Sequence, residues 1–145
     1  MSIERINPPD LHDTPGYHHV TVVSASRLAI FAGQCPLRPD GTVVGADRGP
    51  DDADLDIAVA QTDQIVANTA AGLASVGATA ADVVKTSIYV ASADRAVLVA
   101  VWDRLNASAI ASAFSTASTL LGVAQLGFAG QLVELDVTAA LPEVS

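Results

Sequence analysis

An apolar stripe through residues 55–76 constrains the fold of this chain more than any other feature. Apolar residues and threonines recur there every three or four positions, the spacing of one face of an α-helix. They are Leu55, Val59, Thr62, Ile65, Val66, Thr69, Leu73 and Val76. Asp54 is placed to cap the first turn and Gly77 to end the last one. The sequence therefore predicts a helix with one face to bury, and the rest of the chain must cover it.

Segments rich in β-branched residues lie on both sides of this helix and indicate strands. The predicted strands are residues 17–23, 28–33, 83–91, 117–124 and 131–141. A second helix, capped by Ser92 or Asp94, is predicted to run to about Ile110. The predicted order is β-β-α-β-α-β-β, which defines an α+β domain with a mixed β-sheet and two helices packed on one face.

The length of the chain favours a single domain over residues 1–145. Half of the residues are hydrophobic, so the chain can bury a core without disulfides or metal. Cys35 is the only cysteine, which excludes an internal disulfide and favours a reducing compartment. No apolar stretch has the length of a signal peptide or a membrane span, so we expect a soluble, cytoplasmic protein.

The charge balance argues against nucleic acid and anionic membrane as partners. The chain has 7 Lys and Arg against 16 Asp and Glu, a net charge of −9, and Lys85 is the only lysine. Binding to either partner depends on basic residues that neutralise phosphates. We therefore expect no nucleic acid and no membrane partner.

Three local patterns, read together, resemble the RidA family, also known as YjgF and as the endoribonuclease L-PSP family. The first is Tyr17 followed by a strand and residues 31–36 (Phe-Ala-Gly-Gln-Cys-Pro). The second is Gln61-Thr62, then Asn68, Leu73, Gly77, and Asp82-Val-Val-Lys-Thr86 running into Tyr89-Val90. The third is Ser118-Thr119, Gly122-Val-Ala124, Leu126 and Leu132-Val-Glu-Leu-Asp136. The resemblance covers residues 17–140 in the family's order.

The resemblance implies a chorismate-mutase-like subunit that forms a homotrimer, with small-molecule clefts between neighbouring subunits. It also implies hydrolysis of reactive enamines or imines, such as 2-iminobutanoate, to a keto acid and ammonia. No metal and no organic cofactor takes part in that reaction. An apolar sheet face left uncovered by the two helices would suit burial in such an assembly.

One position departs from the family pattern in a way that bears on the substrate. Family members that act as deaminases clamp the substrate carboxylate with an arginine, and the corresponding residue here is Ser118. Realignment supplies no substitute, because Arg104 is the last basic residue of the chain. A family asparagine on the second helix corresponds to Val99, and the serine of Ser-Gly-Gln is Ala32. A hydroxyl brings no charge to a buried carboxylate, so the loss of the arginine favours a ligand that is neutral, or that presents its polar group elsewhere, over a 2-imino acid.

Other family positions are retained, and the resemblance assigns them roles. Glu134 matches the glutamate that helps to position the hydrolytic water and is the candidate catalytic residue. The candidate ligand-binding residues are Tyr17, His19, Ala32, Gly33, Ser118 and Thr119. Glu134 and Asp136 lie two apart on a strand and face the same side, so they could share a proton as an acid/base pair or simply face solvent.

Four further residues have side chains that can take part in chemistry or ligand binding. His18 and His19 are adjacent on the predicted first strand and point to opposite faces, so they do not form a metal pair, and His19 shares a face with Tyr17. Cys35 has no basic neighbour that would activate it as a nucleophile, so it is read as a small apolar residue. Trp102 is read as a core aromatic in preference to a ligand platform.

The sequence is compatible with three functions. The first is a RidA-like enzyme that uses water oriented by Glu134. The second is a trimer that binds a small ligand without turnover, supported by the loss of both the arginine and the asparagine. The third is the endoribonuclease activity ascribed to some family members, which the net charge of −9 opposes. An arginine of a neighbouring chain, such as Arg27, Arg38 or Arg48, could also enter the cleft.

Overall fold

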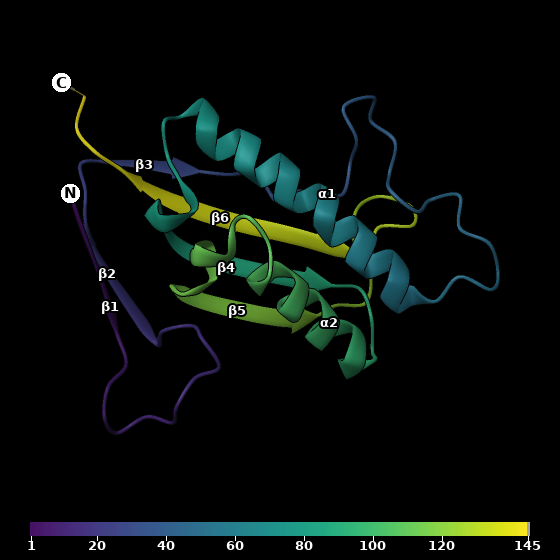
Figure 1. Cartoon of the computed structure of the whole chain (residues 1–145), viewed down its shortest axis with the longest axis horizontal. Helices are drawn as coiled ribbons and strands as arrows, with labels where there is room; N and C mark the ends of the chain where they lie inside the picture. The colour runs from purple at the N-terminus through teal and green to yellow at the C-terminus, as the bar shows by residue number, and fades with distance from the viewer. Residues whose placement is uncertain (145) are drawn as a thin grey trace.

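The computed structural model describes residues 1–144 as one mixed sheet with two long helices on one face and a separate N-terminal hairpin (Figure 1). The main sheet has the order β3-β6-β4-β5, in which β4 and β5 are parallel and the other pairs are antiparallel. Its strands are β3 (Arg27–Ile30), β4 (Val83–Val90), β5 (Ala117–Gly122) and β6 (Val133–Leu141). The predicted α+β class is confirmed.

The long helix α1 (Asp54–Ser75) lies where the apolar stripe predicts it. Gly77 follows its end with φ +73°, a conformation that glycine adopts without strain, so the expected stop is confirmed. The expected cap is wrong: Ala53 is the N-cap residue and makes no side-chain cap bond, while Asp54 lies within the first turn and pairs with Arg48 at 2.6 Å. An acidic residue in the first turn still stabilises the positive end of the helix dipole.

The second helix, α2 (Arg95–Asn106), begins at the predicted cap, because Asp94 accepts a hydrogen bond from the backbone N–H of Ala96 at 2.9 Å. It ends four residues before Ile110, and a short 3₁₀ turn, η2 (Ala111–Phe114), follows. Another 3₁₀ turn, η1 (Ala80–Asp82), leads into β4. The sequence predicts a longer helix because the apolar residues after Asn106, including Ile110 and Phe114, are also buried in the core.

The predicted element order lacks one strand. Residues Ser2–Ile6 form β1, which pairs with β2 (Val20–Ser24) as an antiparallel hairpin beside the main sheet. The guanidinium of Arg5 secures this hairpin by donating hydrogen bonds to the carbonyls of Ala81 and Val83, at 2.9 and 3.2 Å. Only Ile3 and Ile6 among its five residues are apolar, and they lie three positions apart. The segment therefore lacks the alternating apolar pattern from which a strand is predicted.

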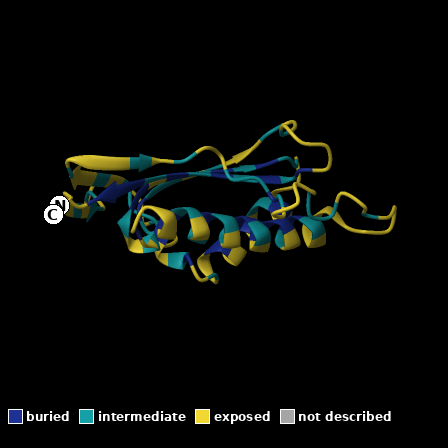
Figure 2. Ribbon diagram, turned by 90° about the horizontal axis from the view of Figure 1, so that it is seen from above, coloured by how far each residue is buried: buried dark blue, intermediate teal, exposed yellow. Residues whose placement is uncertain are grey.

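Figure 2 shows both helices on the same side of the sheet, with the buried residues between the two layers. Along β6 the side chains alternate, so that Val133, Leu135 and Val137 are buried under the helices while Glu134 and Asp136 face the other side. That other side, called here the open face, is not covered by any helix of residues 1–144 (Figure 2). It presents exposed apolar residues, Leu28, Ile30 and Leu121, as expected of a surface that a second chain could bury.

Candidate functional site

The predicted site residues separate into two groups on opposite faces of the sheet. Ser118 pairs in register with Thr86, a buried residue under the helices, and the two hydroxyls hydrogen-bond at 2.6 Å. Glu134 pairs in register with Tyr89 on the open face. A sheet therefore lies between Ser118 and Glu134 of one chain, and no single ligand reaches both within it.

The first group borders a cavity of about 450 Å³ between α2 and the edge strand β5. We call it the Trp102 cavity, and its lining residues are Pro15, Tyr17, Val99, Trp102, Ser118, Thr119 and Leu120. Three predicted ligand-binding residues, Tyr17, Ser118 and Thr119, are thus brought together. A volume of this size falls within the range of small-molecule sites.

Aromatic rings build one wall of the Trp102 cavity. The ring of Trp102 lies edge to face with Tyr17, at 6.1 Å between centroids, and with Phe114, at 6.2 Å. The half-buried indole of Trp102 packs on the core, as predicted, and it also lines the cavity. Its position on α2 carried no local signal that distinguishes these two roles.

The hydroxyls of Ser118 and Thr119, two of the residues that line this cavity, are engaged within the chain. Ser118 accepts from Thr86 and donates to the carbonyl of Thr116 at 3.1 Å. Thr119 turns its hydroxyl to the open face, where it accepts a hydrogen bond from Lys85 at 2.9 Å. The Ser118 hydroxyl is therefore satisfied within the chain.

The second group lies on the open face around Glu134. The thiol of Cys35 donates a hydrogen bond to Oε1 of Glu134 at 3.0 Å, and a Cβ placed on Gly33 would come within 2.8 Å of the Glu134 carboxyl carbon. We call Gly33, Cys35 and Glu134 the Glu134 cluster. Gly33 has no side chain that would displace the carboxylate, so the carboxylate rests directly against the backbone.

The loop that carries Gly33 and Cys35 is held by α1. The side-chain amide of Asn68 donates hydrogen bonds to the carbonyls of Cys35 and Leu37, at 3.1 and 2.9 Å. The backbone of Gln34 bridges to Leu135 of β6, the residue after Glu134. These contacts fix the distance between the loop and the carboxylate.

The remaining predicted residues lie at the borders of these groups. His19 precedes β2 instead of lying within it; its ring hydrogen-bonds to the carbonyl of His12 at 2.8 Å and lies 6.1 Å from the ring of Tyr17. His18 turns elsewhere and bonds to the carbonyl of Ser115. Ala32 is exposed next to Gly33. Within residues 1–144, no three His, Cys, Asp or Glu side chains gather as a metal site would require.

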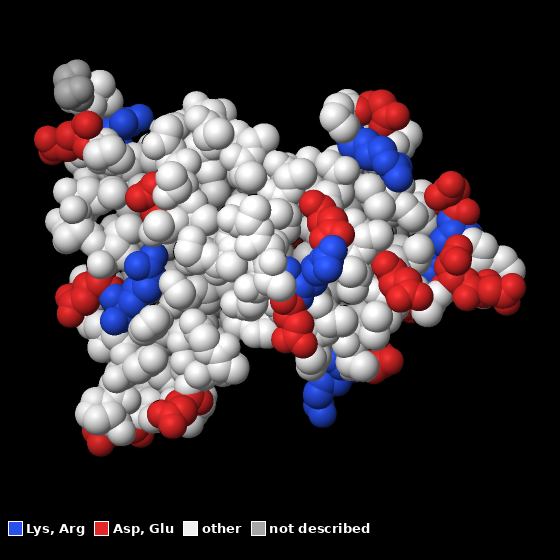
Figure 3. Space-filling view, viewed as in Figure 1, with Lys and Arg blue, Asp and Glu red and all other residues white. Residues whose placement is uncertain are grey.

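The three arginines named as candidates to enter a neighbour's cleft each make a contact within their own chain. Arg27 donates to the carbonyl of Pro142, Arg38 to the hydroxyl of Thr42, and Arg48 pairs with Asp54. On the face that Figure 3 shows, lysine and arginine atoms are scattered and do not form a basic patch. Neither observation favours an anionic ligand or RNA.

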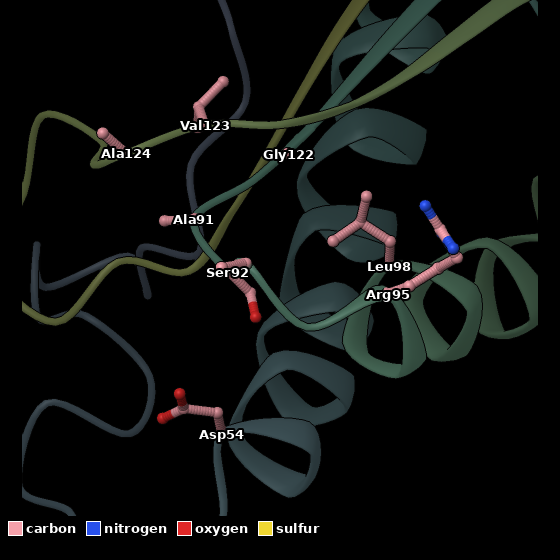
Figure 4. A pocket seen from close by; sticks show the side chains of 9 residues that line it. Asp54, Ala91, Ser92, Arg95, Leu98, Gly122, Val123 and Ala124 are labelled. Atoms are coloured by element: carbon pink, nitrogen blue, oxygen red, sulfur yellow. The ribbon is translucent and has the colours of Figure 1, made fainter.

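A larger hollow of about 810 Å³ lies where the parallel strands β4 and β5 end, between the starts of α1 and α2. Figure 4 shows it lined largely by small residues, with the side chain of Arg95 pointing away from Asp54. None of the predicted catalytic or ligand-binding residues lines it. Among residues 1–144, no helix is long and apolar enough to cross a membrane.

Burial gives Cys35 an unusual titration. Removal from water, followed by the hydrogen bond to Glu134, raises the pKa of the Cys35 thiol to about 11. At pH 8 only about one thiol in a thousand is then ionised, so Cys35 is a poor nucleophile, as its sequence context suggested.

We expect the rate of Cys35 alkylation to report directly on the Glu134 contact. In Glu134→Gln the negative charge beside the thiol is gone, so the pKa falls and the alkylation rate at pH 8 rises by about tenfold for each pKa unit. The measurement is the rate of reaction with iodoacetamide in the folded protein. Asp136→Asn is the control, since Asp136 has the same charge and face but no contact with Cys35, and an equal rise in that variant would contradict the assignment.

The mixed four-stranded sheet with two helices on one face places the chain in the α+β class. The family model described as endoribonuclease L-PSP matches residues 12–141, and the chain belongs to this family. The resemblance read from the three sequence patterns is thereby confirmed.

Solved structures of the same fold agree. A Rid family protein from Yersinia pestis, YyfB, described as of unknown function, is 30% identical over 97% of this chain and 100% of its own, with a TM-score of 0.79. A second Yersinia pestis Rid protein, YyfA, is 24% identical over 97% and 100%, with a TM-score of 0.62. A YjgF/YER057c/UK114 family member from Mycobacterium tuberculosis is 22% identical over 97% and 100%, with a TM-score of 0.57. Comparison with functionally curated proteins gives no significant match.

Proposed function

We propose that this protein is a homotrimer that binds a small metabolite in clefts between subunits and hydrolyses a carbon–nitrogen double bond there. The observation that carries the proposal is the division of the retained family residues between two faces of one sheet. In the proposed assembly, the Trp102 cavity of one chain meets the partner subunit's Glu134. The uncovered apolar residues of the open face, Leu28, Ile30 and Leu121, support association of this kind.

The chemistry would use Glu134 and water alone. Water adds to the carbon of the C=N bond while Glu134 accepts a proton from it and passes that proton to the nitrogen, which gives a neutral carbinolamine. Glu134 then accepts the hydroxyl proton of the carbinolamine as the C=O bond forms, the C–N bond breaks, and this proton leaves with the nitrogen as ammonia. The net reaction converts an imine and water into a carbonyl compound and ammonia. The hydrogen bond from Cys35 would keep the carboxylate oriented for this exchange.

A second candidate is a trimer of the same form that binds its ligand without turnover. The observation that favours it is the internal bonding of Ser118 together with the apolar Val99, because both positions lack the polar group that family deaminases carry. The endoribonuclease activity is not proposed, because a net charge of −9 opposes the approach of RNA.

The test is release of ammonia and 2-oxobutanoate from freshly generated 2-iminobutanoate. We expect little turnover by the native chain and a gain of roughly tenfold to 150-fold in Ser118→Arg, because a charge-assisted clamp contributes about 1.5–3 kcal/mol. Ser118→Ala, which removes the same hydroxyl without adding a cation, serves as the control and should gain nothing. Full turnover by the native chain would show that the clamp is dispensable. Silence of all three proteins would favour the binding trimer.

A further inference from the structure

The Trp102 cavity provides several observations about the kind of molecule it can hold. No charged residue lines it, and its walls are formed mainly by Val99, Leu120, Pro15 and two aromatic rings. The Ser118 hydroxyl accepts from Thr86 and donates to the carbonyl of Thr116, while the Thr119 hydroxyl lies on the open face, where it accepts from Lys85. The side-chain polar groups that remain are the Tyr17 hydroxyl and the Trp102 indole N–H, neither of which makes a hydrogen bond within residues 1–144.

An anion would find no compensation in such a cavity. Transfer of a carboxylate from water into an apolar site is costly unless a cation or several donors meet it. The basic side chain of Lys85 is held on the opposite face, and Arg104 on α2 is paired with Asp63 at 2.7 Å. Arg95, one turn before Val99 on α2, lines the larger hollow instead. This chain, at −9 overall, adds a further repulsion toward anions.

Planar molecules suit the aromatic wall. Trp102 already lies edge to face with Tyr17 and Phe114 at 84° and 75°, an arrangement that a further ring can extend. The free hydroxyl and indole N–H lie at the polar ends of two of these side chains and can each meet one hydrogen-bonding group of a ligand.

We propose that the Trp102 cavity selects a neutral, planar, largely apolar molecule with a single hydrogen-bonding head, and rejects the corresponding carboxylate. This inference rests on the proposed function, since it names the class of ligand for that same cleft. A deaminase of 2-imino acids needs a cation for the substrate carboxylate, and no charged residue lines this cavity. Its aromatic wall, Tyr17 and Trp102, suits a neutral ring instead.

Trp102 is the only tryptophan, so the amide correlation spectrum of the full-length protein contains one indole N–H resonance, which reports on this cavity. The probes are benzamide and benzoate, which share a ring and differ in charge. We expect benzamide to shift the Trp102 resonance in a saturable way, with an affinity at least about tenfold higher than that of benzoate. Ser118→Arg should reverse this preference, because the new guanidinium pairs with the carboxylate.

A blocking variant locates the binding. Val99→Phe fills the cavity from an exposed position on α2 and should abolish the benzamide shift, while Val76→Phe, at an exposed position after α1, should leave it unchanged. Binding that persists in Val99→Phe overturns the inference. So does an affinity for benzoate equal to or above that for benzamide, although the cleft itself then stands. If neither probe shifts Trp102, both the ligand class and the proposed small-molecule cleft are overturned.

Discussion

Replacing Gln61 with leucine is expected to lower the free energy of unfolding by about 3 kcal/mol or more. Gln61 is fully buried on α1, and its amide nitrogen donates to the carbonyls of Val44 and Gly130 at 2.9 and 2.8 Å. Its oxygen accepts from the backbone N–H of Leu132 at 2.7 Å. Leucine leaves these three backbone groups without partners, and each unsatisfied group costs about 1–3 kcal/mol.

The measurement is thermal or urea unfolding, with an expected fall in Tm of roughly 6–12 °C for a chain of this size. Gln64→Leu is the matched control, because Gln64 lies on the same helix and makes one side-chain bond, to Asn68 at 3.0 Å, at a half-buried position. We expect that variant to lose less than about 1 kcal/mol. Equal losses of unfolding free energy in the two variants would mean that the three hydrogen bonds from the Gln61 side chain to backbone groups are not the cause of the loss.

Glu134→Gln is expected to reduce hydrolysis by at least about a hundredfold while leaving the protein folded. The amide keeps the shape of the side chain but cannot accept the proton that water loses as it adds to the C=N carbon. The assay is best run in the Ser118→Arg background with 2-iminobutanoate, where we expect turnover to be measurable. In the single variant Glu134→Gln, an unchanged shift of the Trp102 indole resonance by benzamide would show that the cavity itself is intact.

Asp136→Asn is the control for the effect of Glu134→Gln on hydrolysis. Asp136 shares the open face and strand β6 with Glu134 but has no side-chain hydrogen bond within residues 1–144. We expect less than a roughly threefold change in its turnover. A loss as large as that of Glu134→Gln would mean that the two carboxylates work as a proton-sharing pair, the alternative that their spacing allows.

The sequence predicts the helices and strands where one periodicity runs long enough. The stripe of α1 and the alternation of β6 are both local, so residues 54–75 and the shared face of Glu134 and Asp136 could be predicted. The opposite placement of Ser118 and Glu134 could not, because it depends on the register of β5 and β6 against β4. The contact between Cys35 and Glu134 joins positions 99 residues apart and leaves no local trace.

The two faces of the sheet also determine how defects combine in the proposed assembly. A chain with a blocked Trp102 cavity keeps an intact Glu134, and a Glu134→Gln chain keeps an intact cavity. Co-refolding two such inactive chains would generate some junctions where both sound halves meet, so activity would return by complementation between subunits. Neither variant alone could recover in this way, and dilution that separates the chains would abolish the effect. The sheet would thus make each active centre the joint property of two chains.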